Sequence, residues 1–361
     1  MLGSFAALLT AIALVAPAAQ PRTLVAGPAL AGGRVVWGEQ DQSLSVLRAW
    51  PDTTPFWQSA SSWFAGPLAG SRTLVAFSRS YDGCPGHPGF VCPVETQTLV
   101  GAPRGSLRPL AAAERCSAGG QSRRLAISGS LVAFVELRCD SSSQRVTVHN
   151  GSRIVFQRGA ACCEVALAGW YLAWKSGNSV DVVDLRTHRL VYQVDPPPGE
   201  PIVAFDVQAN GVLAMILGPG PNGRATLALR SPRAPGLHRL PLPALLAPQG
   251  PSVRGVGDRV VFVAAIGRRA ASQLMVADLR GRLHVLARFS ASVEQAGEID
   301  ATNGRVTWAS RHITSTRMDC PPPGQGRPCR LLKSGTETIW LADLPSGPPR
   351  PIARWAFADA P

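Results

Sequence analysis

Apolar and polar residues alternate along this chain in short runs, and glycine or proline separates most of the runs. Examples are RVVWGE at 34–39, LVAFVEL at 131–137 and RVTWAS at 305–310. A period of two places successive side chains on opposite faces of a β-strand. The 36 glycines and 32 prolines bound these strands, and no segment of helical length has an apolar period of 3.6 residues. The pattern therefore predicts an all-β protein.

One type of strand returns along the chain with an aromatic residue or methionine near its end. These anchor residues are Trp37, Phe77, Phe134, Trp174, Met215, Phe262 and Trp308. Their spacings of 40, 57, 40, 41, 47 and 46 residues are typical of propeller blades. We expect a seven-bladed β-propeller of four-stranded antiparallel blades over residues 22–361, with boundaries near 60, 121, 162, 201, 250 and 296. The anchors should be buried between adjacent blades.

Two segments carry a resemblance to a known family. The TolB-type β-propeller repeat resembles both GWYLAWKSGNSVDVVDL (169–185) and GDRVVFVAAIGRRAASQLMVADL (257–279). The resemblance covers nearly all of the chain after residue 22. It implies a WD-repeat-like propeller of the exported bacterial type. It does not imply one activity, because propellers serve binding, scaffold and catalytic roles.

Residues 1–18 have the pattern of a secretory signal peptide. They carry no charged side chain, and an apolar run from Phe5 to Val15 precedes the small-residue site Ala16-Pro17-Ala18. An anchoring helix is the alternative, although a span needs about 20 apolar residues. No later segment is long enough to span a membrane. We therefore expect a secreted or periplasmic protein with no membrane span after signal removal.

The formal net charge of +13 raises the question of an anionic partner. Only Lys175 and Lys333 are lysines, and the arginines are scattered rather than clustered, as in a protein from a GC-rich genome. We therefore expect no nucleic-acid partner. A protein or a cell-envelope polymer is the expected partner, and we expect a monomer.

Eight cysteines in an exported chain indicate disulfides. The expected local bridges are Cys84–Cys92 and Cys320–Cys329, each of which closes a short loop. Three pairings are possible among the other four, Cys116, Cys139, Cys162 and Cys163. A four-cysteine zinc site is the alternative, but the spacing lacks a C-x₂-C pair.

All eight cysteines fall in loops after second strands or in connections between blades, which emerge on one face of a propeller. The longest insertions, at 79–95, 263–272 and 311–336, lie on that face too. Long loops on a rigid ring commonly carry binding function. This cysteine face is therefore the expected working face. The six histidines are dispersed and expected in solvent, except that His312 and the adjacent Arg311 in the last insertion are candidates for ligand contact.

Charged residues on the first strand of each blade should border the central channel. The candidates are Arg124, Glu164, Asp206, Arg254, Glu298 and Asp300. They could hold a small polar ligand, or a calcium ion through the carboxylates. We favour the alternative, in which these charges pair across blades in a water-filled channel.

No catalytic motif stands out in the chain. H-E-x-x-H, G-x-S-x-G and Walker A patterns are absent from the sequence. The expected function is a binding or interaction module for an unknown ligand, without catalytic residues. The alternative is a hydrolase or lyase that acts on carbohydrate, peptide or another envelope polymer, with channel carboxylates as acid and base.

Overall fold

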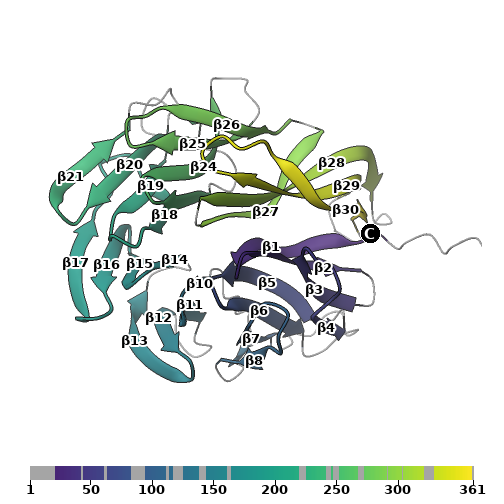
Figure 1. Ribbon diagram of the computed structural model, residues 1–361, viewed down its shortest axis with the longest axis horizontal. Coiled ribbons are helices and arrows are strands. Elements are labelled where there is room, and N and C mark those ends of the chain that lie inside the picture. Colours follow the sequence, from purple (N-terminus) through teal and green to yellow (C-terminus); the bar gives the residue numbers. More distant parts are fainter. Residues whose placement is uncertain are drawn as a thin grey trace, which may run out of the picture.

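A computed structural model gives the architecture. It describes residues 21–41, 44–60, 63–82, 94–110, 114–116, 125–137, 144–160, 164–218, 225–240, 245–246, 252–266, 272–290, 292–302, 304–320 and 329–359. Seven antiparallel sheets are arranged in a ring, as Figure 1 shows, and the described residues contain no helix. The protein is a seven-bladed β-propeller, as the repeat predicts.

Each of the first four blades is formed by consecutive strands. Blade 1 consists of β1 (Thr23–Ala31), β2 (Arg34–Gln40), β3 (Leu44–Trp50) and β4 (Trp57–Ala60). Blade 2 consists of β5 (Trp63–Gly70), β6 (Val75–Asp82), β7 (Val94–Gly101), β8 (Arg108–Pro109) and β9 (Glu114–Cys116). Blade 3 consists of β10 (Leu125–Ser128), β11 (Leu131–Leu137), β12 (Gln144–Asn150) and β13 (Arg153–Ala160). Blade 4 consists of β14 (Val165–Ala168), β15 (Tyr171–Ser176), β16 (Ser179–Asp184) and β17 (Arg189–Val194).

The last three blades follow the same order. Blade 5 consists of β18 (Ile202–Val207), β19 (Leu213–Leu217), β20 (Thr226–Ser231) and β21 (Ala234–Arg239). Blade 6 consists of β22 (Leu245–Leu246), β23 (Val253–Val256), β24 (Arg259–Ile266), β25 (Ser272–Asp278) and β26 (Leu283–Arg288). Blade 7 consists of β27 (Val293–Thr302), β28 (Arg305–Asp319), β29 (Arg330–Asp343) and β30 (Arg350–Ala358). It starts before the boundary expected near residue 296, because β27 pairs with the long β28 as far back as Val293↔His312.

All seven anchor residues are buried, as their recurrence predicts. Each anchor packs against the preceding blade, so that the core divides into seven clusters, one at each seam between blades. Trp174 of blade 4, for example, packs with Val146 and Phe156 of blade 3. Trp37 of blade 1 packs with Ala309 and Ile339 of blade 7, which closes the ring.

Two blades depart from the regular pattern. In blade 2 the fourth strand is interrupted, and its two parts, β8 and β9, both pair with β7. In blade 6 the first strand is interrupted in the same manner, since β22 and β23 both pair with β24. β8, β9 and β22 are only two or three residues long and carry no period, so the sequence pattern did not predict them, whereas β23 is the predicted first strand that carries Arg254.

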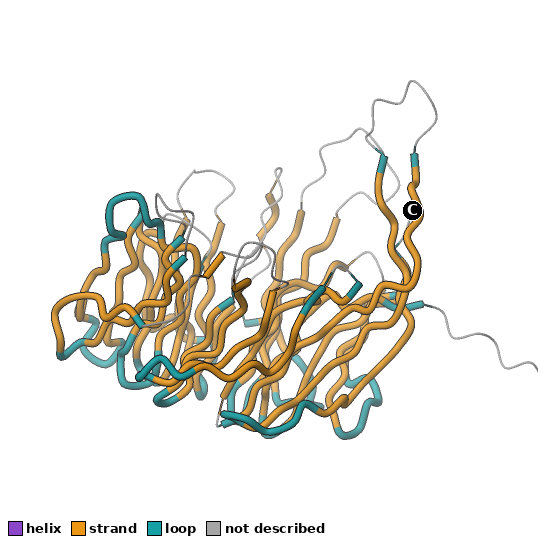
Figure 2. Tube along the Cα trace, turned by 90° about the horizontal axis from the view of Figure 1, so that it is seen from above, coloured by secondary structure: helices purple, strands orange, loops and turns teal. Residues whose placement is uncertain are grey.

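The two rims of the ring differ. Hairpin turns between first and second and between third and fourth strands are short and form one rim, the turn face. Figure 2 shows the other rim, from which one pair of strands rises beyond the rest; β28 and β29 are the longest strands among the described residues. This second rim is the cysteine face of the sequence analysis.

Within the described ranges, no helix is long and apolar enough to cross a membrane. The expected signal peptide, residues 1–18, lies outside the described residues.

Candidate functional site

The innermost strands carry seven equivalent residues, one in each blade, and all of them except the fully buried Ala29 line the central channel. In each blade, this residue on the first strand pairs with the residue on the second strand that comes directly before the anchor. Four of the seven are alanines, in blades 1 to 4: Ala29, Ala69, Ala126 and Ala166. The other three are charged, in blades 5 to 7: Asp206, Arg254 and Asp300. The channel is therefore polar on one side and lined by small apolar groups on the other.

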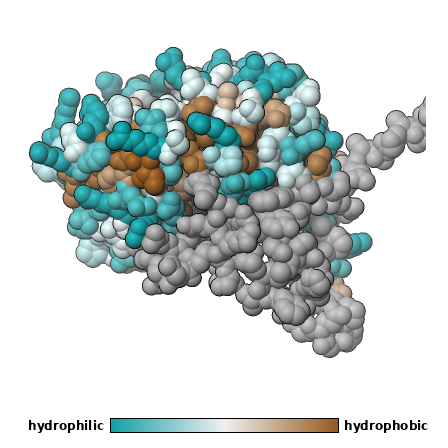
Figure 3. Space-filling model, turned by 90° about the horizontal axis from the view of Figure 1, so that it is seen from below, coloured by the Kyte–Doolittle hydropathy of each residue, from teal (hydrophilic) through white to brown (hydrophobic). Residues whose placement is uncertain are grey.

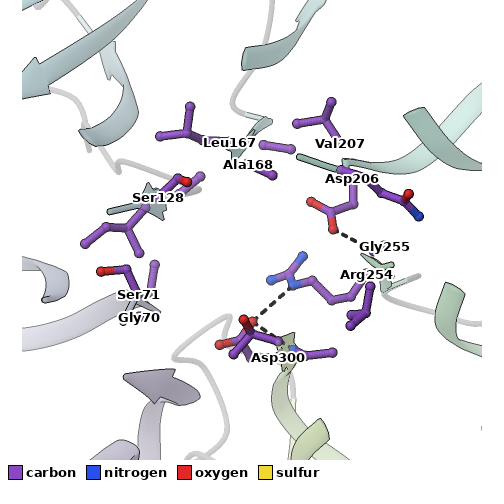
Figure 4. A pocket seen from close by; sticks show the side chains of 18 of the residues that line it. Gly70, Ser71, Ser128, Leu167, Ala168, Asp206, Val207, Arg254, Gly255 and Asp300 are labelled. Carbon is purple, nitrogen blue, oxygen red and sulfur yellow. Dashed lines mark hydrogen bonds and ion pairs between the residues drawn. The ribbon is translucent and has the colours of Figure 1, made fainter. Parts of the chain in front are cut away.

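Arg254 extends between two aspartates, as Figure 4 shows. Its Nη2 lies 3.4 Å from Oε2 of Glu298, and its Nε lies 3.7 Å from Oδ1 of Asp300. Burial opposes the charge of Arg254, but the negative charges of Asp206, Glu298 and Asp300 raise its pKa above the ordinary value. Arg254 is therefore a permanent cation within a group of three carboxylates.

Both aspartates also join adjacent blades through backbone hydrogen bonds. The N–H of Gly255 in blade 6 donates to Oδ2 of Asp206 in blade 5, at 2.8 Å. The N–H of Leu30 in blade 1 donates to Oδ2 of Asp300 in blade 7, also at 2.8 Å. Burial raises the pKa of Asp300 above its usual range even though Arg254 acts in the opposite direction. These contacts make the aspartates structural links between blades.

A cavity of about 500 Å³ lies at the centre of the ring. Asp206, Arg254, Glu298 and Asp300 line it, together with Ser71 and Ser128 from the opposite side (Figure 4). Of the other predicted channel residues, Glu164 precedes β14 and does not line the cavity; among the described residues its buried Oε2 has no hydrogen-bond partner. Arg124 lies outside the described residues.

The channel carboxylates are a poor calcium site. Calcium takes six to eight oxygen ligands, and here Arg254 already places a positive charge among the carboxylates. In the part of the chain that the structure describes, no cluster of three or more His, Cys, Asp or Glu residues could hold a metal ion. The same arginine separates the aspartates that the alternative enzyme would use as acid and base.

On the cysteine face, β28 and β29 continue as a two-stranded arm, residues 314–320 and 329–332. A disulfide joins Cys320 to Cys329 at its end. Next to the disulfide, Met318 and Leu331 lie directly opposite each other in the pairing register and are 60% and 51% exposed. The arm therefore presents two neighbouring apolar side chains, Met318 and Leu331, to solvent beside a disulfide that links its two strands.

The other expected features of this face are distributed as follows. Arg311 points into blade 7, where it pairs with Glu337, whereas the adjacent His312 is exposed. Cys116 ends β9 and lies opposite Val94 at the start of β7. The remaining cysteines lie outside the described residues: Cys84, Cys92, Cys139, Cys162 and Cys163.

Sequence reasoning missed two buried carboxylates at the seam between blades 7 and 1. Glu337 accepts hydrogen bonds from the N–H of Leu24 at 2.7 Å, from Trp355 Nε1 at 3.0 Å and from Arg311 Nη2 at 2.6 Å. Glu39 accepts one from Trp37 Nε1 at 2.7 Å. The alternation along the strands could have revealed both residues. Glu39 lies two residues after the buried anchor Trp37, and Glu337 lies two residues before the buried Ile339, so each shares a face of its strand with a buried residue.

One histidine also contradicts the expectation that histidines are in solvent. His149 on β12 is buried and stacks on Phe134, with ring centroids 5.3 Å apart. Neither of its ring nitrogens has a hydrogen-bond partner among the described residues. Burial lowers its pKa.

The outermost strands of the blades expose further apolar side chains around the circumference of the ring. Ile154 on β13 and Leu190 on β17 are about half exposed. Figure 3, seen from below the view of Figure 1, shows apolar patches surrounded by hydrophilic side chains. Isolated exposed apolar residues are ordinary on protein surfaces, so these patches do not by themselves mark a site.

No family model matches the sequence, and no curated protein matches it significantly. Among solved structures, the chain is similar to the crystal structure of Saccharomyces cerevisiae Sqt1, at 9% sequence identity and a TM-score of 0.47. The similarity covers 95% of this chain and 97% of that one. What the structure itself establishes is the architecture, a seven-bladed β-propeller.

Proposed function

We propose that this protein is an exported, TolB-like propeller that acts as a binding module through its cysteine face. The observation that carries the proposal is the arm, whose end is closed by Cys320–Cys329 next to the exposed pair of Met318 and Leu331. The disulfide between Cys320 and Cys329 limits the conformations of the arm before binding. Preorganised elements lose less conformational entropy on association and therefore bind more tightly.

The chemistry of the arm favours a protein over a carbohydrate polymer as partner. Met318 and Leu331 offer adjacent apolar area, and methionine adapts its shape to different apolar surfaces. Among the described residues, the two arm segments, 314–320 and 329–332, pair in the sheet only with each other, so both strands keep unpaired edges. Such edges accept an added strand from another chain.

Export remains a proposal that rests on the pattern of residues 1–18 and on the disulfide, which persists in oxidising compartments. No calcium ion is proposed for the channel, because Arg254 already balances carboxylate charge there.

The experiment compares partner capture from the envelope fraction of the source cells by four forms of the mature protein. These are the wild type, Cys320→Ser/Cys329→Ser, Met318→Ser/Leu331→Ser, and the control Leu279→Ser. Leu279 is 46% exposed in the turn after β25, on the turn face. We expect both arm variants to lose partners that the wild type and the control retain, with unchanged β-type circular dichroism. Loss with the control and retention with the arm variants would place the working face on the other rim.

A further inference from the structure

A second cavity lies on the turn face, between blades 7, 1 and 2. Its volume is about 390 Å³, and the hairpin turns after β1, β5 and β27 border it. Its lining residues are Leu30, Gly32, Gly33, Ser71, Arg72, Thr302 and Arg305. Ser71, Arg72 and Thr302 also line the central channel, so the two spaces adjoin. We name the smaller one the arginine notch.

The walls of the arginine notch are held in place by backbone contacts. The N–H of Gly32 donates to the carbonyl of Ser71 at 2.8 Å, which ties the first turn of blade 1 to blade 2. The Ser71 hydroxyl donates to the carbonyl of Gly129 at 3.0 Å, which ties blade 2 to blade 3. The space beside Gly33 is open, because a Cβ at that position would meet no atom within 4 Å. The space is therefore preformed.

The charges in the notch have one sign. Among the described residues, Arg72 and Arg305 are its only charged lining residues, and both are cations. Arg72 has no ion pair or hydrogen bond within the described ranges. Arg305 Nε lies 3.3 Å from Oδ1 of Asp343, an exposed aspartate that does not line the notch. Two guanidinium groups at a small cavity are suited to a carboxylate or phosphate, which arginine can bind in a bidentate manner.

The adjoining channel also carries negative charge. Three carboxylates, Arg254 and the shared Arg72 line it, together with the hydroxyl groups of Ser71 and Ser128. Glu298 is 39% exposed there, and carboxylates and hydroxyls accept hydrogen bonds from sugar hydroxyl groups. A ligand that occupies both spaces would place an anionic group in the notch and hydroxyl groups toward the channel.

We propose that the turn face binds a small hydroxylated anion, of the uronic acid or sugar phosphate class, with its acidic group between Arg72 and Arg305. The site lies on the opposite rim from the arm and is independent of the function proposed above. A uronic acid and a sugar phosphate share the recognised chemistry, an anion on a polyhydroxylated ring.

The test is a calorimetric titration of the mature protein with four probes: glucuronate, glucose 6-phosphate, glucose and inorganic phosphate. The proteins are the wild type, Arg72→Gln, Arg305→Gln and the control Arg153→Gln. Arg153 is exposed at the start of β13, on the same rim but outside both cavities, and its substitution changes the net charge equally. Circular dichroism verifies the fold of each variant.

We expect at least one of the two charged sugars to bind the wild type more tightly than glucose or phosphate does. Arg72→Gln and Arg305→Gln should each weaken that binding about tenfold, the usual scale for loss of a charged hydrogen bond, and Arg153→Gln should not. Absence of binding at millimolar concentrations, equal binding of glucose, equal binding of phosphate, or equal loss with Arg153→Gln would each overturn the proposal. Partner capture through the arm should be unchanged in all variants, which separates this test from that of the cysteine face.

Discussion

Single residues with buried polar groups account for much of what is specific to this propeller. Glu337 and Arg254 both have oppositely charged partners from other strands, and those partners are distant in sequence. The sequence predicts that Arg254, Asp206 and Asp300 lie near the channel, because their strands are recognisable. It does not predict which of them meet, since that depends on the angle between blades.

Replacement of Glu337 by alanine should lower the free energy of unfolding by about 3–5 kcal/mol. The side chain is completely buried, and its loss would leave Arg311 and the N–H groups of Leu24 and Trp355 without their acceptor. Chemical denaturation measures the effect. Glu294→Ala is the control, because Glu294 pairs with Lys333 in a partly exposed site, where such pairs contribute about 0–1 kcal/mol. Equal losses in the two variants would contradict the assigned role.

His149 should make stability sensitive to acid. Burial lowers its pKa in the folded state, so below about pH 6.5 the unfolded chain binds a proton that the folded chain does not. The free energy of unfolding should therefore fall as the pH decreases through that region. His149→Phe should reduce this pH dependence, as measured by denaturation between pH 7 and pH 5. Substitution of the exposed His284 by glutamine should leave the slope as it is.

At the scale of elements, short apolar runs bounded by glycine or proline predict the strands that are buried between adjacent blades. The second strands with their anchors are the clearest example, since β2 and β19 are buried on both faces, and all seven are found. The arm is the counter-example: the sequence predicts an insertion loop over 311–336, whereas β28 continues to Asp319 and β29 starts at Arg330. Both faces of this hairpin are largely polar, as in ITSTR at 313–317, so hydrophobic alternation carries no signal there.

Truncation of an anchor tests the register of a whole blade. Trp174→Ala should cost about 3–5 kcal/mol, because the side chain fills the seam between blades 3 and 4. Trp170→Ala is the matched control, since Trp170 lies in the β14–β15 turn and is 47% exposed. Its loss should change stability by less than about 1 kcal/mol. The comparison uses urea unfolding followed by circular dichroism, and similar midpoints for the two variants would refute the assigned packing.

At the scale of the whole molecule, the ring closes without exchange of strands. Blades 1 and 7 are each formed by consecutive segments, and the closing contacts are side-chain packing and hydrogen bonds. Gly297 permits the close approach, since a Cβ there would lie 2.2 Å from the carbonyl oxygen of Gly27. The repeat predicts the number of blades, whereas the manner of closure depends on contacts between distant segments and was not predicted.

This closure predicts that a circular permutant folds. The N–H of Arg22 donates to the carbonyl of Ala356 at 3.0 Å, so a short glycine-serine linker can join the two ends of the propeller. New ends placed among Pro196–Pro198 would separate β17 from β18 without interrupting a strand. We expect β-type circular dichroism and cooperative melting close to that of the parent chain. An aggregated or uncooperative product would show that the order of blades along the chain is essential for folding.

The closing seam also bears on how such a ring can change its size. In some propellers one blade combines strands from both ends of the chain, and an added terminal blade would then have to leave that shared sheet intact. Here every blade is complete before the next begins, and only the contacts between blades 7 and 1 join the two ends of the series. Duplication or loss of a terminal blade would therefore create one new seam without re-pairing any strand, and the angle between neighbouring blades would change around the whole ring. Because stability in repeat proteins is approximately a sum over neighbouring units, the adjustment would be shared among all the seams.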